Sequence, residues 1–216
     1  MTVKILIADD HRIMREGLRA LLEKQQDFEV VAEAGDGRTA VSLSQELSPD
    51  IVIMDVSMPE LNGIEATRTI INMNPQTKVI ALSMLSSNTF AIEMFKAGSS
   101  AYILKDCASE ELVYAVHSAL KDQIYLSPVM ATSFMKDFLR KSWEETPTSA
   151  FSILTNRERE VLQLFAEGKA TKEIAALLQV SPKTIETQRQ NIFSKLNIKN
   201  VAELTRYAIR EGLISP

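Results

Sequence analysis

The carboxylates, the serine and the lysine that could do chemistry in this chain stand at the ends of apolar runs. Asp55 directly follows four apolar residues, and Asp9 and Asp10 follow another such run. Ser83 and Lys105 hold the same kind of position farther along the chain. Short continuous apolar runs are typical of strands buried on both faces of a parallel sheet. Because the carboxyl ends of parallel strands meet at one edge, we expect these side chains to converge there.

Three converging carboxylates repel one another, and a divalent cation would relieve that repulsion. Hard oxygen ligands predict Mg²⁺, or Mn²⁺, at this edge. The Lys105 ammonium could neutralise phosphoryl oxygens, and the Ser83 hydroxyl could donate a hydrogen bond to one of them. With Asp55 as the nucleophile, the set suits phosphoryl transfer. The alternative is that the acids only cap helices, as Asp10 could cap a helix that starts at His11.

The elements that must position these residues alternate in type. Five runs have strand character: Lys4–Ala8, Phe28–Ala34, Ile51–Asp55, Lys78–Ser83 and Ala101–Leu104. Five others have helical character: His11–Gln25, Arg38–Leu47, Gly63–Met73, Thr89–Ala97 and Ser109–Leu120. This order predicts an α/β domain over residues 1–121, a doubly wound five-stranded parallel sheet of the flavodoxin-like type. In the first helix we expect one apolar side made of Ile13, Leu18, Leu21 and Leu22.

The pattern changes after residue 121. Residues 122–150 are expected to form a linker that contains a helix over residues 128–141, for which Ser127 and Pro128 are suitable first residues. The rest of this segment is polar and interrupted by proline. Residues 151–216 predict an all-α domain of four helices: Asn156–Glu167, Thr171–Leu178, Pro182–Leu196 and Val201–Glu211.

Two of these helices have the spacing of a helix-turn-helix, with Ser181 and Pro182 marking the start of the second. Its apolar face holds Ile185, Ile192 and Leu196, and Arg189 beside that face is expected to pair with an acid of the same domain. Exposed polar side chains there could read base edges or contact phosphates. The candidate DNA-binding residues are Lys172, Lys183, Thr184, Thr187, Gln190, Asn191, Ser194 and Lys195. By periodicity alone, a merely solvated polar face is the better interpretation.

Composition agrees with two soluble domains, 45% hydrophobic and 24% charged, without a transmembrane run or a signal peptide. Residues 151–216 hold 10 basic and 7 acidic side chains, whereas residues 1–150 hold 14 and 21. A basic part on an acidic chain favours a nucleic-acid module. The single cysteine, Cys107, fits a reducing cytoplasm, where we expect the protein to be.

The first part of the chain resembles the receiver domains of bacterial response regulators, over about residues 3–121. The residues that carry the resemblance are Asp9, Asp10, Asp55, Met58, Pro59, Asn62, Gly63, Ser83 and Lys105. It implies that a sensor histidine kinase phosphorylates Asp55, with Mg²⁺ held by Asp10, Asp55 and the Ser57 carbonyl and with Asp9 close by. It also implies that Tyr102 turns inward as Ser83 moves toward the phosphoryl group. Alternatively, Tyr102 is a packed strand residue with its hydroxyl at the surface.

One departure from the receiver pattern follows the lysine. Many receivers have proline there, often after a cis bond, whereas this chain has Asp106, so we expect a trans peptide. His11 lies beside the acids, and we expect it to be a solvated residue at the helix start.

Residues 152–214 resemble the LuxR-type DNA-binding domain. The resemblance rests on the segments Leu154–Leu162, Thr171–Ala175, Lys183–Glu186 and Lys195-Leu196, together with Ser181. A receiver joined to this domain is the architecture of the NarL/FixJ family of transcription regulators. It implies promoter binding as a homodimer through helix 182–196, with Val201, Thr205 and Ala208 as candidates for the dimer contact and Leu204 and Ile209 in the core. Gln188 stands where the family commonly has histidine.

Two other classes compete with this interpretation. A phosphatase of the haloacid-dehalogenase type needs a second acid two residues after the nucleophile, where this chain has Ser57, so we expect no turnover enzyme beyond slow autodephosphorylation. A dinucleotide-binding protein needs a glycine-rich turn where this chain has Asp9 and Asp10. A receiver fold controlled by something other than phosphate stays open.

Overall fold

The computed structural model describes residues 2–84, 86–141, 153–211 and 213–214. The chain divides into two compact units, residues 1–145 and 146–216. The polar stretch predicted after the linker helix lies outside the described residues. Among those described, no helix has the length and apolar character that crossing a bilayer requires.

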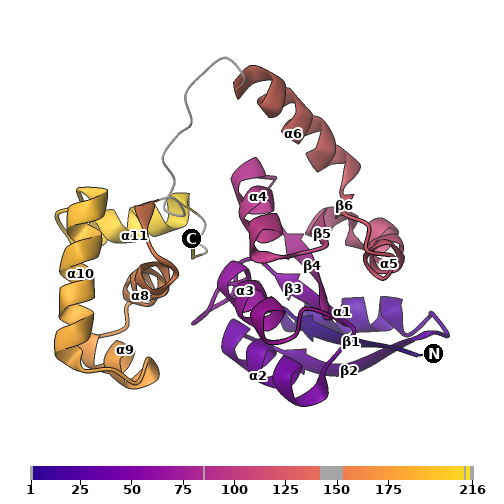
Figure 1. The fold of residues 1–216 in the computed structure, drawn as a ribbon, viewed down its shortest axis with the longest axis horizontal. Helices are drawn as coiled ribbons and strands as arrows, with labels where there is room; N and C mark the ends of the chain where they lie inside the picture. Colours follow the sequence, from indigo (N-terminus) through magenta and orange to yellow (C-terminus); the bar gives the residue numbers. More distant parts are fainter. Residues whose placement is uncertain (1, 85, 142–152, 212, 215–216) are drawn as a thin grey trace. The chain divides into compact units, whose positions relative to one another are not determined.

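The first unit is built on one parallel sheet with the strand order β2-β1-β3-β4-β5-β6 (Figure 1). The strands are β1 Val3–Ala8, β2 Phe28–Ala34, β3 Ile51–Asp55, β4 Lys78–Ser83, β5 Ala101–Leu104 and β6 Tyr125–Leu126. The helices are α1 Arg12–Leu22, α2 Gly37–Leu47, α3 Gly63–Met73, α4 Asn88–Ala97, α5 Ala108–Ala119 and α6 Pro128–Lys141, with a 3₁₀ turn at Lys105–Cys107.

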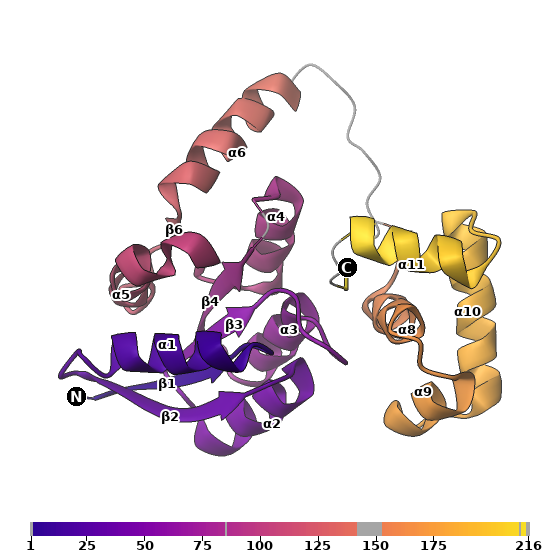
Figure 2. The same ribbon diagram turned by 180° about the vertical axis from the view of Figure 1, so that it is seen from behind.

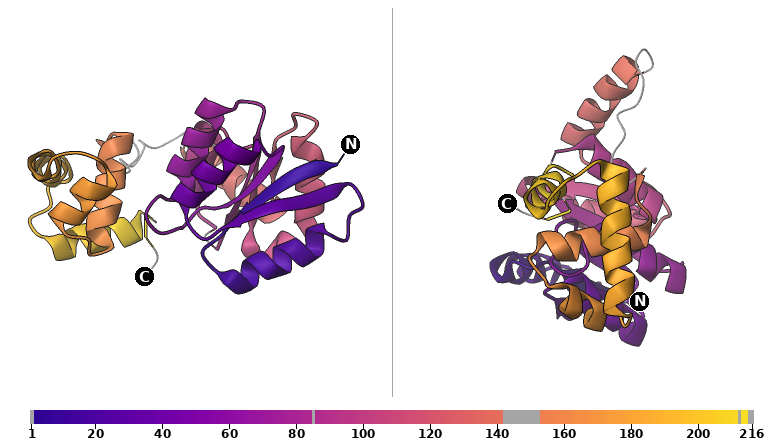
Figure 3. Two further views of the ribbon diagram at one scale, coloured as in Figure 1. Left: turned by 90° about the horizontal axis from the view of Figure 1, so that it is seen from below. Right: turned by 90° about the vertical axis from the view of Figure 1, so that its left-hand side faces the viewer.

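Helices cover both faces of this sheet (Figure 3). Helices α1 and α5 contact each other on one face, and α2, α3 and α4 form consecutive contacting pairs on the other. In register, Ile5 pairs with Ile51 and Ile53 with Ile80, so side chains of equal parity point to the same face. The four apolar residues of β3 are fully buried, which confirms the doubly covered strand inferred from the sequence.

The doubly wound parallel sheet is confirmed, with one strand more than the predicted five. The sixth, β6, has only two residues, too few to produce a periodic pattern. The five predicted strands agree with the structure to within one residue. The first helix, Arg12–Leu22, is shorter than the predicted range His11–Gln25.

The prediction for Ile13 was wrong. Leu18 and Leu22 are buried, but Ile13 is 85% exposed. Five residues along a helix correspond to about 140° of rotation, so Ile13 cannot share a face with Leu18. Ile13 therefore lies on the solvent side of α1.

The described residues of the second unit form four helices, drawn in orange and yellow in Figure 2: α8 Asn156–Ala166, α9 Thr171–Leu177, α10 Pro182–Leu196 and α11 Val201–Arg210. A capping box between Thr155 and Glu158 starts α8. Ser181 accepts from the Thr184 amide and Pro182 takes the first position of α10. Helices α8, α9, α10 and α11 enclose a separate core, in which Ile185, Ile192 and Leu204 are almost inaccessible.

Candidate functional site

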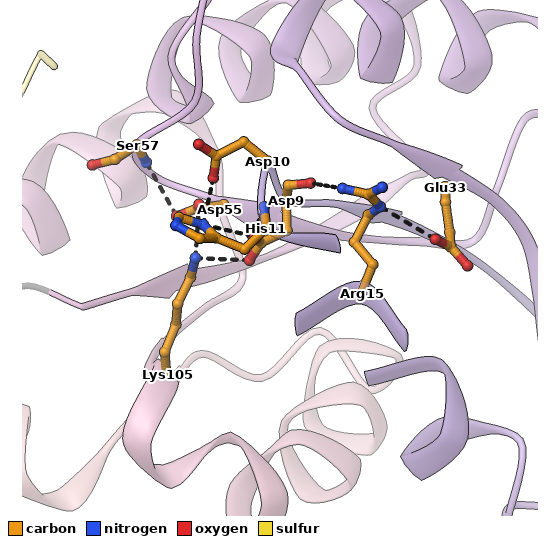
Figure 4. A network of polar contacts seen from close by, with 8 residues as sticks. All are labelled: Asp9, Asp10, His11, Arg15, Glu33, Asp55, Ser57 and Lys105. Atoms are coloured by element: carbon orange, nitrogen blue, oxygen red, sulfur yellow. Dashed lines mark hydrogen bonds and ion pairs between the residues drawn. The ribbon is translucent and has the colours of Figure 1, made fainter. Parts of the chain in front are cut away.

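The ends of β1 and β3 bring the acidic residues together, as expected from their positions. The two strands are paired, with Ala8 opposite Met54, so Asp9 and Asp55 emerge side by side. Carboxylate oxygens of Asp9, Asp10 and Asp55 and a ring nitrogen of His11 all lie within 4.8 Å of one another (Figure 4). Asp9 and Asp55 are buried, whereas Asp10 and His11 are exposed.

Lys105 lies between the two buried acids. Its Nζ atom is 2.8 Å from Asp55 Oδ2 and 2.7 Å from Asp9 Oδ2. Burial alone would lower the pKa of Lys105, but the carboxylates of Asp55 and Asp9 outweigh it and raise the pKa above its usual value. The ammonium is therefore charged, and it is aimed at the oxygens of the proposed phosphoacceptor.

The surroundings of the Asp55 carboxyl disfavour its ionised form. Burial raises its pKa to about 6, with the Asp9 charge adding to this rise and Lys105 opposing it. The backbone N–H of Ser57 donates to Asp55 Oδ1 at 3.2 Å. A pocket that disfavours the ionised form of its own carboxylate in this way fits a hard divalent cation, because the cation would supply the missing positive charge. The donor set of three carboxylates suits Mg²⁺ or Mn²⁺.

His11 contacts both neighbouring acids. Its backbone N–H donates to Asp9 Oδ1 at 2.8 Å, and its Nδ1 atom is 2.7 Å from Asp10 Oδ1. The side chain is 69% exposed, as expected for a residue at the helix start, yet it belongs to the group around the acids. Its place directly after two acids was the signal for this in the sequence.

Ser83 and Tyr102 are joined by a side-chain hydrogen bond. Ser83 is the last residue of β4, and Tyr102 lies on the neighbouring β5. Tyr102 is fully buried, so the alternative with its hydroxyl at the surface was wrong. Burial raises the pKa of Tyr102 to about 12, which keeps the phenol neutral. The described residues contain no cis peptide bond, in agreement with the trans bond expected before Asp106.

The outer face of α10 presents the polar side chains expected from the helical wheel. Those exposed on it are Lys183, Thr184, Thr187, Gln190, Asn191, Ser194 and Lys195, and Lys172 is exposed on α9. Thr184 shares a 2.8 Å hydrogen bond with the Ser181 hydroxyl, and Thr187 donates to the Lys183 carbonyl. The rest of the row is at the surface of the helix-turn-helix.

Two basic residues of α10 form ion pairs with acids of the same domain. Arg189 pairs with Glu186, as expected for its place on the wheel, and its guanidinium lies 5.8 Å from the centre of the Phe165 ring. The Lys195 Nζ atom is 2.7 Å from Glu158 Oε2, but its side chain is 41% exposed, so the phosphate contact expected of it stays a prediction. The contact with Glu158 spans two helices, so helical periodicity could not reveal it.

The candidates for a dimer contact on α11 separate by burial. Val201 is 47% exposed and Thr205 is partly exposed, but Ala208 is fully buried, so its selection as a surface residue was wrong. Ala208 lies four residues after the buried Leu204 and therefore shares its core-facing stripe. Ile209, expected in the core, is exposed instead.

Both units match known protein families. Residues 5–117 match the response regulator receiver domain, and residues 152–208 match the bacterial regulatory proteins of the luxR family. The chain is 38% identical over 215 residues to the oxygen regulatory protein NreC of Staphylococcus aureus, covering 98% of this chain and 99% of that protein.

Solved structures give the same answer. The RcsB response regulator of Salmonella typhimurium is 28% identical with a TM-score of 0.67, over 97% of this chain and 98% of that one. A structure of an RcsB–DNA complex is also 28% identical, with a TM-score of 0.61, over 98% of this chain and 99% of that one. This chain therefore belongs to the NarL/FixJ family of two-component response regulators, with a receiver domain followed by a LuxR-type DNA-binding domain.

Proposed function

We propose that this chain is a transcription regulator switched by Mg²⁺-dependent phosphorylation of Asp55 by a partner sensor histidine kinase. The observation that carries the proposal is the buried Asp55 carboxylate, which Lys105 and the Ser57 N–H contact while Asp9 and Asp10 lie beside it. An Asp55 oxygen would form the new bond to phosphorus as the phosphorus–nitrogen bond of the donor phosphohistidine breaks.

Each neighbour of Asp55 has a separate proposed task. Asp10, Asp55 and the Ser57 carbonyl would hold Mg²⁺, or Mn²⁺, with Asp9 close by. The bound cation would neutralise developing charge on the phosphoryl oxygens. Lys105 would donate to one phosphoryl oxygen and Ser83 to another.

The phosphoryl group would act as a stored signal. We assign the switch to Ser83 and Tyr102, because a Ser83 hydroxyl that turned toward the phosphoryl group would change its hydrogen bond to Tyr102. Hydrolysis of the aspartyl phosphate would be slow and would reset the protein, so we class it as a regulator and not as a turnover enzyme. The population shift cannot exceed the difference in interaction free energy between the two states.

The output is proposed to be binding to double-stranded promoter DNA through α10. Base contacts are assigned to the exposed row of α10 that includes Lys183, Gln190 and Asn191, and contacts to the DNA backbone are assigned to Lys172 and Lys195. A homodimer would match two operator half-sites, with Val201 and Thr205 in its contact. We propose residues 1–121 as the receiver, 122–150 as the linker and 151–216 as the DNA-binding domain, with no membrane partner and a cytoplasmic location.

Phosphorylation is tested by incubating the full chain with acetyl phosphate and Mg²⁺ and measuring the intact mass. Wild type is expected to gain one phosphoryl group, and Asp55→Asn is expected to gain none. Asp27→Asn serves as the matched control, because Asp27 is an exposed acid just before β2. If wild type stays unmodified, or Asp55→Asn is modified equally, the proposed phosphoacceptor is wrong.

DNA binding is tested on the same samples with a library of promoter fragments. Beryllofluoride with Mg²⁺ is expected to increase affinity or dimer formation in wild type and to leave Asp55→Asn unchanged. An unchanged wild type would refute the switch but leave the DNA-binding domain in place.

A further inference from the structure

Arg15 contacts the backbone of the turn that carries Asp9 and Asp10. Its Nη1 atom donates to the backbone carbonyl of Asp9 at 2.7 Å, and its Nε atom donates to Glu33 Oε2 at 3.2 Å (Figure 4). The Arg15 side chain is only 17% exposed. It thus connects the helix after the acids to the strand beside them.

Glu33 anchors this guanidinium. It lies on β2 opposite Ile7 of β1, and its second oxygen accepts from Arg19 Nε at 2.6 Å. The hydrogen bond from Arg19 is the main reason that the pKa of Glu33 lies below its usual value, and Arg15 contributes in the same direction. An ionised carboxylate between two guanidinium groups keeps Arg15 in one orientation.

The Arg15 contact acts on the peptide unit between Asp9 and Asp10. A peptide unit is planar, so a donor fixed on the Asp9 oxygen also fixes the direction in which the chain continues to Asp10. The Asp9 side chain has two further contacts, from Lys105 and from the His11 N–H. The Asp10 carboxylate is exposed and contacts the His11 imidazole, so its orientation depends largely on the backbone.

We propose that Arg15 is a positioning residue of the acidic pocket, orienting the Asp9–Asp10 peptide so that both carboxylates face the cation site. This rests on the proposed function, because the cation site is part of that proposal. A guanidinium suits the task, since its rigid fork serves two acceptors in different directions and never loses its charge. A lysine ammonium is a point charge without that fork.

The test compares two arginines that share Glu33. Arg15→Met removes the contact to the Asp9 carbonyl, whereas Arg19→Met loosens Glu33 and leaves that contact in place. Mg²⁺ binding to the full chain is measured by calorimetry, and hydrogen exchange of β1 and β3 amides reports the stability of the first unit. Arg12→Met, which removes an 83% exposed arginine of the same helix, controls for the loss of one positive charge.

We expect Arg15→Met to raise the Mg²⁺ dissociation constant about three- to tenfold. This is the range for losing a hydrogen bond from a charged donor when only part of the loss reaches the cation site. Arg19→Met and Arg12→Met should stay within about twofold of wild type. If Arg15→Met does not fold, Arg15→Lys keeps the charge without the fork and should show a smaller loss in the same direction.

Two results would overturn the positioning role while the proposed function stands. One is an unchanged Mg²⁺ affinity in Arg15→Met, or in Arg15→Lys where that variant replaces it. The other is an equal loss in Arg15→Met and Arg19→Met, which would mean general loosening of the unit. If wild type itself does not bind Mg²⁺, the proposed function fails first and the positioning role falls with it.

Discussion

Replacing Asp55 by asparagine is expected to stabilise the metal-free receiver unit. The carboxyl is 3% exposed and its pKa rises from 3.8 to about 6, chiefly because it is buried. At pH 7.5 ionised Asp55 therefore costs about 3 kcal/mol, at about 1.4 kcal/mol for each pH unit by which the pKa is raised. Asparagine has nearly the same shape without the charge, so this cost should disappear.

The stability difference between Asp55→Asn and wild type should depend on pH. A carboxyl whose pKa is higher in the folded state binds more protons there, so stability falls as pH rises from about 4 to about 6. The advantage of Asp55→Asn should thus grow from about 1.6 kcal/mol at pH 5 to about 3 kcal/mol at pH 7.5. Saturating Mg²⁺ should largely close the gap, because metal at 100 times its dissociation constant stabilises only wild type, by about 2.7 kcal/mol.

Hydrogen exchange of the buried β3 and β4 amides, in EDTA and in Mg²⁺, measures the free energy of unfolding of this unit alone. Lys105→Met provides a control of opposite sign, because losing the ammonium leaves two buried carboxylates facing each other. If Asp55→Asn is no more stable than wild type in EDTA at pH 7.5, or the difference is independent of pH, the electrostatic account of the pocket is wrong.

Three further predictions concern other parts of the chain. Lys183→Ala and Gln190→Ala should each weaken specific DNA binding by about 1–3 kcal/mol, and undiminished affinity in a gel-shift titration would remove them from the readout row. Lys195→Met should destabilise the second unit by about 1 kcal/mol at neutral pH through loss of its contact to Glu158. Because Lys195 helps keep the pKa of Glu158 below 4.5, hydrogen exchange of α8 should show this difference fading as pH falls through that range, and a constant difference would contradict it. Leu18→Ala should cost about 2–5 kcal/mol in chemical denaturation, whereas Ile13→Ala should stay within about 0.5 kcal/mol, and equal losses would contradict the assignment of faces in α1.

The fold could be predicted from the sequence where local signals were strong. The clearest case is β3, where a continuous apolar run that ends in Asp55 predicted the strand, because an interior parallel strand buries every side chain. Caps such as Thr155 and Ser181 fixed the starts of α8 and α10 for the same local reason. The acidic cluster followed from topology, since parallel strands end at one edge.

The sequence could not reveal contacts between residues that are distant along the chain, and its predictions failed where a face was assigned too broadly. The contact of Lys195 with Glu158 spans 37 residues, and that of Arg15 with Glu33 spans 18, so no helical period records either. Ile13 and Ala208 were misplaced because a face was assigned from spacing alone, before the direction of the core was known. Tyr102 was left open between two positions, because β6, which makes its strand an interior one, was not predicted.

The hydrogen bond between Ser83 and Tyr102 sets a condition on the proposed switch. If Ser83 turned to a phosphoryl group while Tyr102 stayed in place, the buried phenol would lose its Ser83 partner, at a cost of about 1–3 kcal/mol. That cost is lower if Tyr102 moves together with Ser83, because its hydroxyl can then find water or another acceptor. The two residues are therefore expected to change state as a pair, and the phosphoryl group must supply more interaction energy to Ser83 than the pair loses.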